Sequence, residues 1–141
     1  MIHLPTAAGG RVEHLVHLGQ AVRRGDALAR VHPVEGPYEE ICAAVDGVVA
    51  RQRLQGQEAP RYARVVGLTR VVLAITPGRV RWIATLGPVD VTTMVALVEL
   101  EGCVRPHRAG GSGFVGQRYC RPGERVIAGQ PLLEIRGEEL V

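Results

Sequence analysis

Residues 19–31 read GQAVRRGDALARV, and residues 123–135 read GERVIAGQPLLEI. Both stretches follow the pattern G-x-x-V-x-x-G-x-x-L-x-x-(V/I), which we call the glycine template. Its glycines permit tight turns, and its valine anchors a short connector in the core between them. The chain then enters a strand whose alternate Leu and Val or Ile side chains point inward. The template therefore predicts a strand, a turn and another strand near each end of the chain.

The composition favours short strands around these two segments. The chain has 141 residues, within the usual size of one domain, with 18 Gly and 9 Pro but only 1 Trp, 3 Tyr and 1 Phe. Such a composition indicates many tight turns between short segments rich in Val and Leu. The sequence is too apolar for a disordered chain, and it has no apolar run long enough to cross a bilayer. We expect an all-β globular protein with no membrane partner.

The basic residues narrow the possible chemistry. All 17 of them are Arg, so no lysine amine is available for a Schiff base, a P-loop or the amide attachment of biotin or lipoate. The formal net charge is +3, and the arginines are scattered singly rather than gathered beside aromatic residues. Because nucleic-acid binding needs a clustered basic face, we expect no nucleic-acid partner.

The cysteines and the first residues indicate a reducing compartment. The chain has 3 cysteines, an odd number without zinc-finger spacing, which does not fit a disulfide scaffold. Residues 1–6 read MIHLPT and have neither the basic nor the apolar region of a signal peptide. We therefore expect a cytoplasmic protein.

A second, shorter similarity pairs residues 44–49, which read AVDGVV, with residues 99–104, which read ELEGCV. Together with the glycine template, residues 44–49 resemble the biotinyl/lipoyl attachment family. Residues 10–31 are similar to the first half-motif of that family, while the second is divided between residues 43–49 and 123–135. The resemblance implies an all-β barrel-sandwich hybrid built from two half-motifs related by a pseudo-twofold. It also implies a single domain over residues 1–141, with an insertion or strand duplication at about 53–95.

The sequence departs from that family at the position of its modified lysine. By the resemblance, the turn that carries this lysine falls in residues 33–38, with Gly36 closest to the lysine's place. No amine is present there, so the scaffold is kept without the swinging-arm chemistry. We expect no cofactor, and we do not expect a biotin or lipoate carrier.

The segment between the two templates predicts further strands. Residues 65–75 are β-branched and end at a Pro-Gly turn, which is typical of a buried strand. Residues 79–86 alternate, which places Val80 and Trp82 on one face of a half-buried strand. Residues 90–101 fit either a helix or a strand, and their β-branched side chains favour the strand.

These middle residues also show a fainter resemblance, to the C-terminal half of phosphatidylserine decarboxylases. The resemblance rests on residues 79–91 followed by the late template hairpin. Those enzymes cleave themselves at a Gly-Ser-Thr element to create a pyruvoyl group. Here the only Gly-Ser pair, Gly111-Ser112, precedes the hairpin and continues into Gly113, so the activity is not carried over.

A few side chains are candidates for catalysis or metal binding. The candidate catalytic residues are Cys103, His107 and Arg108, which lie in or near a basic, glycine-rich stretch at residues 105–113. Cys103 and His107 also form the best short pair of metal ligands, because thiolate and imidazole bind zinc. The same stretch fits a backbone nest for an anion, although an ordinary flexible loop is the favoured interpretation. The alternative to a metal site is that the small cysteines, including Cys42 and Cys103, are buried in the core and the histidines are exposed at the surface.

The acidic residues Glu35, Glu39 and Glu40 admit two interpretations. One is a catalytic carboxylate pair, which needs a pocket that shifts a pKa and a partner group, and the sequence locates neither. The other, which is favoured, is a solvated face of a hairpin.

The function that follows is a non-catalytic scaffold module for protein contact or self-association, with exposed hairpin turns as its recognition surface. Two alternatives stay open. One is a small lyase or hydrolase that uses Cys103, His107 or Arg108, and the other is a metal-binding protein that uses His and Cys side chains.

Overall fold

The structure is a computed structural model that describes residues 1–137. All of its regular elements are strands, and no helix occurs in the described part of the chain. No segment of residues 1–137 forms a helix that meets the length and hydropathy needed to span a membrane. The all-β prediction is therefore confirmed.

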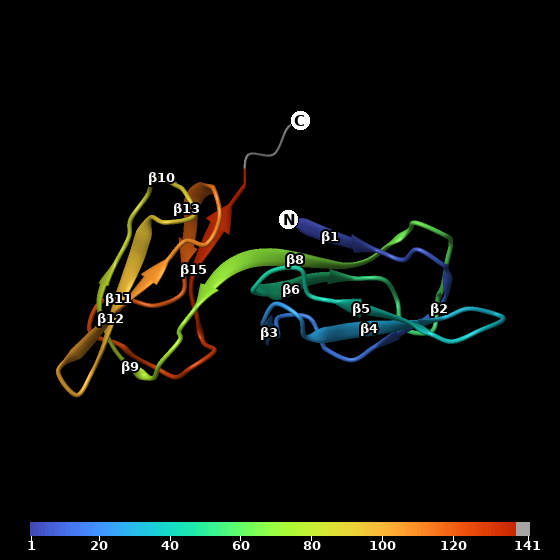
Figure 1. Ribbon diagram of the computed structural model, residues 1–141, viewed down its shortest axis with the longest axis horizontal. Helices are drawn as coiled ribbons and strands as arrows, with labels where there is room; N and C mark the ends of the chain where they lie inside the picture. Colours follow the sequence, from blue (N-terminus) through green and yellow to red (C-terminus); the bar gives the residue numbers. More distant parts are fainter. Residues whose placement is uncertain (138–141) are drawn as a thin grey trace. The chain divides into compact units, whose positions relative to one another are not determined.

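The chain divides into two compact units, residues 1–69 and 70–141. In Figure 1 the strands of unit 1 run from blue to green and those of unit 2 from green to red. The boundary lies inside β8 (Arg64–Leu73), so residues 64–69 of this strand belong to unit 1 and residues 70–73 to unit 2.

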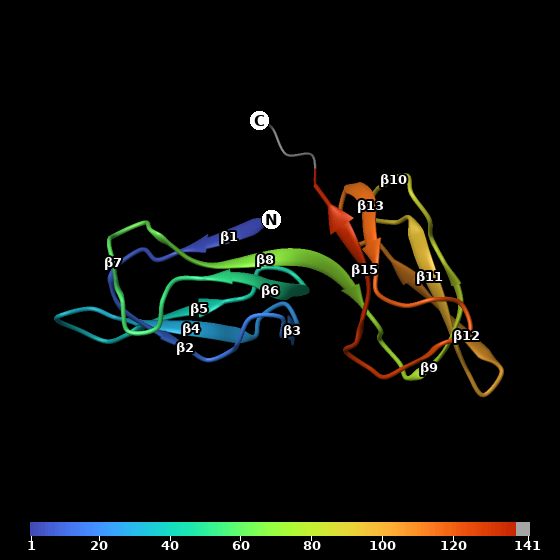
Figure 2. The ribbon, with the colours of Figure 1, turned by 180° about the vertical axis from the view of Figure 1, so that it is seen from behind.

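Unit 1 consists of two antiparallel four-stranded layers. One layer has the order β5-β4-β2-β7 and the other β1-β8-β6-β3. Figure 2 shows β2, β4 and β5 on one side of the unit and β1, β6 and β8 on the other. The bounds are β1 (Ile2–Pro5), β2 (Gly10–His14), β3 (Ala21–Val22), β4 (Ala27–His32), β5 (Glu39–Cys42), β6 (Gly47–Gln52) and β7 (Glu58–Ala59).

Unit 2 repeats this arrangement strand for strand. Its layers have the orders β12-β11-β9-β14 and β8-β15-β13-β10. The end of β8 pairs with β15 in unit 2, just as β1 pairs with β8 in unit 1. The bounds are β9 (Gly78–Ile83), β10 (Pro88–Val89), β11 (Met94–Leu100), β12 (Cys103–Arg108), β13 (Gly113–Arg118), β14 (Arg125–Val126) and β15 (Pro131–Arg136).

Two glycines at the same position show how closely the units correspond. Gly10 begins β2 and Gly78 begins β9, and both have a positive φ, 144° and 154°. A Cβ on Gly10 would lie 2.3 Å from the carbonyl oxygen of His32, and one on Gly78 would lie 2.3 Å from that of Glu99. Only glycine permits this close approach, because any side chain would collide with backbone.

Each unit has its own hydrophobic core between its two layers. The core of unit 1 contains Leu28 and Leu68, and that of unit 2 contains Leu132 and Ile135. No residue belongs to both clusters. Because each pair of layers buries its own inward faces, each unit has the organisation of a small domain.

The division differs from the single domain expected from the sequence, whose residues 138–141 lie outside the described part. Residues 53–95 were expected to be an insertion or duplication within one domain. In the structure, residues 53–69 complete unit 1 and residues 70–95 begin unit 2. The strand predictions for 65–75 and 90–101 are confirmed by β8 and β11, although residues 90–93 form a turn.

The predicted face of Trp82 is wrong. Val80 is buried, but Trp82 is 41% exposed, so the two side chains do not share the inner face. Val98 of β11 lies opposite Val80 and its neighbour Leu97 lies opposite Trp82, which leaves Arg81 as an extra residue in β9. This β-bulge shifts the alternation by one residue and turns Trp82 outward.

Candidate functional site

His107, predicted as a catalytic or metal-binding residue, is a buried residue of β12 with only 1% of its surface exposed. The Ile75 amide donates a hydrogen bond to its Nε2 atom (2.9 Å), so its Nδ1 atom carries the proton and faces the Arg105 carbonyl oxygen (3.2 Å). Burial lowers the pKa of His107. Both ring nitrogens are occupied, and Nε2 has no lone pair left for a metal ion.

The other two candidates do not join it. Cys103 is exposed at the start of β12, four residues from His107, which in a strand corresponds to about 13 Å. Arg108 is exposed, and its Nη1 atom donates to the Thr92 carbonyl oxygen (2.6 Å). Residues 1–137 contain no group of three or more His, Cys, Asp or Glu side chains placed to hold a metal ion. The structure thus brings these candidates together neither as a catalytic set nor as a ligand set.

Two further expectations for this region are corrected. Cys42 and Cys103 were expected in the core, but both are exposed and only Cys120 is buried. Their strands, β5 and β12, lie at the edges of their layers. Successive side chains of a strand point to opposite faces, and Cys42 and Cys103 are on the face away from the core. The stretch 105–113 was favoured as a flexible loop, but residues 105–108 belong to β12, and Gly111 is buried within reach of the Arg70 guanidinium.

The acidic cluster is not a uniformly solvated face. Glu39 accepts hydrogen bonds from the Thr6 hydroxyl, the Ala7 amide (3.0 Å) and the Ala8 amide (3.5 Å). Burial opposes its ionisation, but these hydrogen bonds outweigh burial and lower the pKa of Glu39. Glu35 and Glu40 are exposed. Glu39 therefore fixes the loop after β1, and the three carboxylates do not form a catalytic pair.

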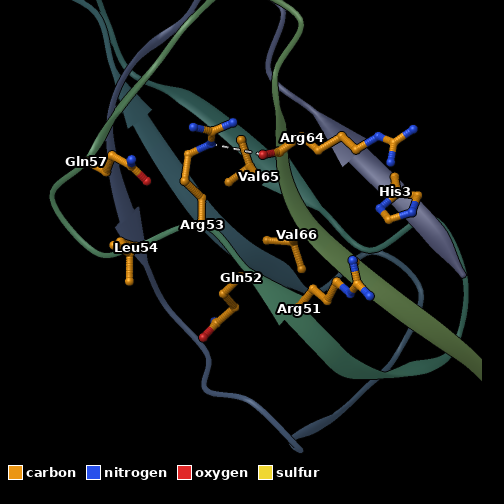
Figure 3. Close-up of a pocket in the computed structure, with 10 residues that line it drawn as sticks. His3, Arg51, Gln52, Arg53, Leu54, Gln57, Arg64, Val65 and Val66 are labelled. Carbon is orange, nitrogen blue, oxygen red and sulfur yellow. Dashed lines mark hydrogen bonds between the residues drawn. The ribbon is translucent and has the colours of Figure 1, made fainter.

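A pocket of about 370 Å³ in unit 1 has the chemistry of an anion-binding site. It lies along β1, β6, β8 and the loop after β6, and Figure 3 shows the side chains that line it. Three of these are arginines, Arg51, Arg53 and Arg64, and none of the lining residues that the structure describes is acidic. The lining residues are His3, Arg51, Gln52, Arg53, Leu54, Gln57, Arg64, Val65, Val66 and Gly67.

Hydrogen bonds position one wall of this arginine pocket. The Arg53 Nε atom donates to the Arg64 carbonyl oxygen (3.1 Å), drawn as the dashed line in Figure 3. The Arg53 carbonyl oxygen forms a hydrogen bond with Nε2 of the His14 ring. The side-chain amide of Gln52 donates to the Val16 carbonyl oxygen (2.8 Å). The loop after β6 is thereby tied to its neighbours, so the guanidinium of Arg53 is held in place rather than mobile.

Gly67 leaves room for the side chains of Met1, Arg51 and His3 beside the pocket. It lies in the buried part of β8, opposite His3 of β1. A Cβ at this position would lie 2.7 Å from the Met1 sulfur, 3.3 Å from Cβ of Arg51 and 3.5 Å from Nδ1 of His3. Any larger residue would therefore crowd the wall between His3 and Arg51.

The corresponding place in unit 2 has a different charge. A pocket there is lined by Arg118, Tyr119, Cys120, Arg121 and Glu124. Glu124 corresponds to Gln57. The Val80 amide donates to the Glu124 carbonyl oxygen in unit 2, as the Val12 amide donates to the Gln57 carbonyl oxygen in unit 1. Glu134, the fourth residue of β15, corresponds to Gly67, the fourth of β8. Unit 2 thus has two carboxylates where unit 1 has none.

The outer face of the β9-β11-β12 sheet is a second candidate surface. Trp82, Leu97 and Pro106 are cross-strand neighbours, and we call them the apolar row. Trp82 and Pro106 are exposed, and Leu97 is partly buried. The corresponding residues of unit 1 are Glu13, Arg30 and Glu40, which are all charged. Only unit 2 therefore presents apolar side chains here.

No protein-family model matches the chain, and a search of curated proteins finds no match to it.

Sequence reasoning missed both surfaces for a physical reason. Arg51 and Arg64 are thirteen residues apart and come together only because β6 and β8 are neighbours. The one local signal was Gly67 inside a β-branched run, since an interior strand glycine often marks a close approach. The apolar row depends on the bulge at Arg81, which the alternation of the sequence does not show.

Proposed function

We propose that the chain is a non-catalytic module for protein contact, built from two units of the barrel-sandwich hybrid type found in biotinyl/lipoyl domains. The strand pairing supports the fold assignment. Within unit 1, the pairs β2-β4, β2-β7 and β4-β5 have counterparts in β6-β8, β6-β3 and β8-β1. This exchange of equivalent pairs is what a pseudo-twofold between half-motifs requires, and unit 2 repeats it.

The turns at the family's lysine position support a non-carrier role. In unit 1 this turn joins β4 to β5, and its residue Val34 is 98% exposed. In unit 2 the equivalent turn consists of Glu101 and Gly102, which have φ values of 52° and 81°. Neither turn contains a lysine. Both are accessible for recognition by another protein, but neither can carry an amide-linked cofactor.

The apolar row is the observation that carries the proposed contact. A monomeric protein gains nothing from keeping Trp82 and Pro106 together in water, whereas aromatic side chains are enriched at protein interfaces. Unit 1 shows that the same sheet face is compatible with polar side chains, because Arg30 occupies the position of Leu97. The apolar side chains are therefore not required by the fold.

The test uses Leu97→Arg, which gives unit 2 the residue of unit 1. Sedimentation velocity over a range of concentrations, and co-purification from cell extract, should show association of the wild-type protein that this variant loses. Trp82 is the only tryptophan, so its fluorescence should shift to the blue on association and stay unchanged in the variant.

Arg30→Leu, the reverse exchange in unit 1, is the matched control for a general effect of apolar substitution. A wild-type protein that is monomeric at every concentration and purifies without a partner would contradict the proposal. Equal association of wild type and Leu97→Arg would place the contact elsewhere and remove the apolar row as its basis.

A further inference from the structure

We propose that the arginine pocket of unit 1 binds the phosphoryl group of a small molecule. The inference does not depend on the apolar row, which lies in unit 2. Its chemical basis is the composition of the pocket wall, which among residues 1–137 has three guanidinium groups and no carboxylate. Guanidinium groups donate paired, charge-assisted hydrogen bonds that match the geometry of phosphate oxygens.

The arginines are available for a ligand. Within residues 1–137, the guanidinium groups of Arg51 and Arg64 form no ion pair with a carboxylate. Other arginines of the chain do, such as Arg81 with Glu99 and Arg136 with Glu134. Like charges gathered without a counter-charge repel one another, and a bound anion relieves that repulsion.

Unit 2 serves as an internal comparison. At the equivalent positions, Glu124 replaces Gln57 and Glu134 replaces Gly67. The carboxylate of Glu134 accepts from Nε of Arg136 (2.6 Å) and, second to burial, raises the pKa of Tyr119 in the pocket wall. The same architecture can therefore supply its own negative charges. At these two positions unit 1 has Gln57 and Gly67, neither of which carries a charge.

The size and the charge of the pocket favour a phosphorylated small molecule. A volume of about 370 Å³ suits a small ligand rather than a macromolecular surface. A single carboxylate would leave most of the positive charge unbalanced, whereas a phosphomonoester or pyrophosphate carries two or more negative charges. Leu54, which is 74% exposed, adds an apolar side chain for the remainder of such a ligand.

The experiment is a titration of the full chain with pyrophosphate, inorganic phosphate and acetate at pH 7.5 and constant ionic strength. Binding is followed by calorimetry and by the amide resonances of Gly67 and Arg51. We expect saturable binding at one site, tighter for pyrophosphate than for phosphate and absent for acetate. The shifted resonances should belong to the pocket and not to Arg118 or Arg121 of unit 2.

Three variants test the assignment. Arg64→Gln and Gln57→Glu should each weaken pyrophosphate binding about tenfold or more, because one removes a charged donor and the other installs the carboxylate of unit 2. Arg118→Gln, the matched control in the unit 2 pocket, should leave affinity unchanged. The amide spectrum of Gln57→Glu away from the pocket should match that of the wild type, which separates lost binding from lost folding.

Two outcomes would overturn the inference. One is pyrophosphate binding that does not saturate or that disappears equally in Arg118→Gln, since this indicates general attraction to arginine. The other is wild-type affinity in both pocket variants. Neither outcome affects the proposed protein contact, which is tested by Leu97→Arg.

Discussion

At equivalent places in the two units, different side chains accept the same backbone hydrogen bond. In unit 1 the Ala7 amide, just after β1, donates to Glu39 of β5. In unit 2 the Ile75 amide, just after β8, donates to His107 of β12. His107 therefore has a structural role that explains its burial without catalysis.

The burial of His107 predicts how stability depends on pH. Its folded-state pKa lies below the ordinary value of 6.5, so the unfolded chain binds more protons between these two values. The free energy of unfolding should fall as the pH decreases from 7.5 through 6.5. In His107→Gln this part of the fall should be absent, because glutamine accepts the Ile75 hydrogen bond without titrating.

Urea denaturation of both proteins at pH 7.5 and 5.5 measures the difference. His17→Gln, at an exposed position, is the control and should retain the pH dependence of the wild type. If His107→Gln loses as much stability on acidification as the wild type, protonation of His107 is not the cause of the pH dependence.

At the scale of elements, the structure contains four copies of the glycine template rather than two. Each copy is a two-residue strand, four turn residues and a longer strand, as in β3-β4, β7-β8, β10-β11 and β14-β15. The template valine corresponds to Val22, Ala59, Val89 and Val126, and the template leucine to Leu28, Val65, Val95 and Leu132. All four residues at the leucine position are buried.

These copies explain which part of the fold the sequence could reveal. The first and last copies keep their glycines, so the pattern identifies them, and the all-β class follows from their turns. The second copy has Tyr62 and the third has Thr92 where the others have Gly25 and Gly129. The apolar positions persist because the core requires them, but Val, Leu and Ala are too common to mark a repeat. The sequence therefore left both an insertion and a strand duplication open for residues 53–95.

The site was less predictable than the fold for a different reason. The pocket wall combines residues from β1, β6 and β8, which are brought together by long-range pairing that no local pattern specifies. The predicted residues Cys103 and His107 share a strand, but distance along it and burial keep them apart. Local chemistry in the sequence therefore suggested candidate residues that the tertiary structure does not bring together.

Tyr62 replaces a template glycine, and the resulting backbone strain should lower stability by a measurable amount. It has a φ of 65°, in the left-handed region, where the equivalent Gly129 has 85°. A non-glycine residue there costs about 1–2 kcal/mol, and the extra freedom of glycine in the unfolded chain offsets about half of it. Tyr62→Gly should thus raise the free energy of unfolding of unit 1 by about 0.5 kcal/mol. Gly129→Ala should lower the free energy of unfolding of unit 2 by about 1 kcal/mol.

Chemical denaturation of the three proteins measures these differences. Tyr62→Phe keeps the backbone conformation and serves as the control, because it removes only an exposed hydroxyl. A loss of stability in Tyr62→Gly equal to that in Gly129→Ala would show that the tyrosine side chain contributes more than the strain removes.

For the whole molecule, the duplicated pairing has an energetic consequence as well as a topological one. Each unit buries its own apolar cluster, and the two clusters share no residue. The units are joined in sequence through β8, whose first residues pair in unit 1 and whose last residues pair in unit 2. Stability is therefore expected to be distributed over two cores, and a single free energy of unfolding does not describe it.

Leu28 and Leu132 allow this expectation to be tested with identical chemistry. Both occupy the leucine position of the template and are fully buried, one in each core. Each substitution by alanine should destabilise its own unit by about 2–5 kcal/mol. Trp82, the only tryptophan, lies in unit 2, so its fluorescence reports the unfolding of that unit. In urea, Leu132→Ala should lower the midpoint of the fluorescence transition and Leu28→Ala should leave it unchanged. Amide resonances of Val12 and Val31 in unit 1 should respond in the opposite way, whereas equal shifts of both probes in both variants would mean that the two cores unfold as one.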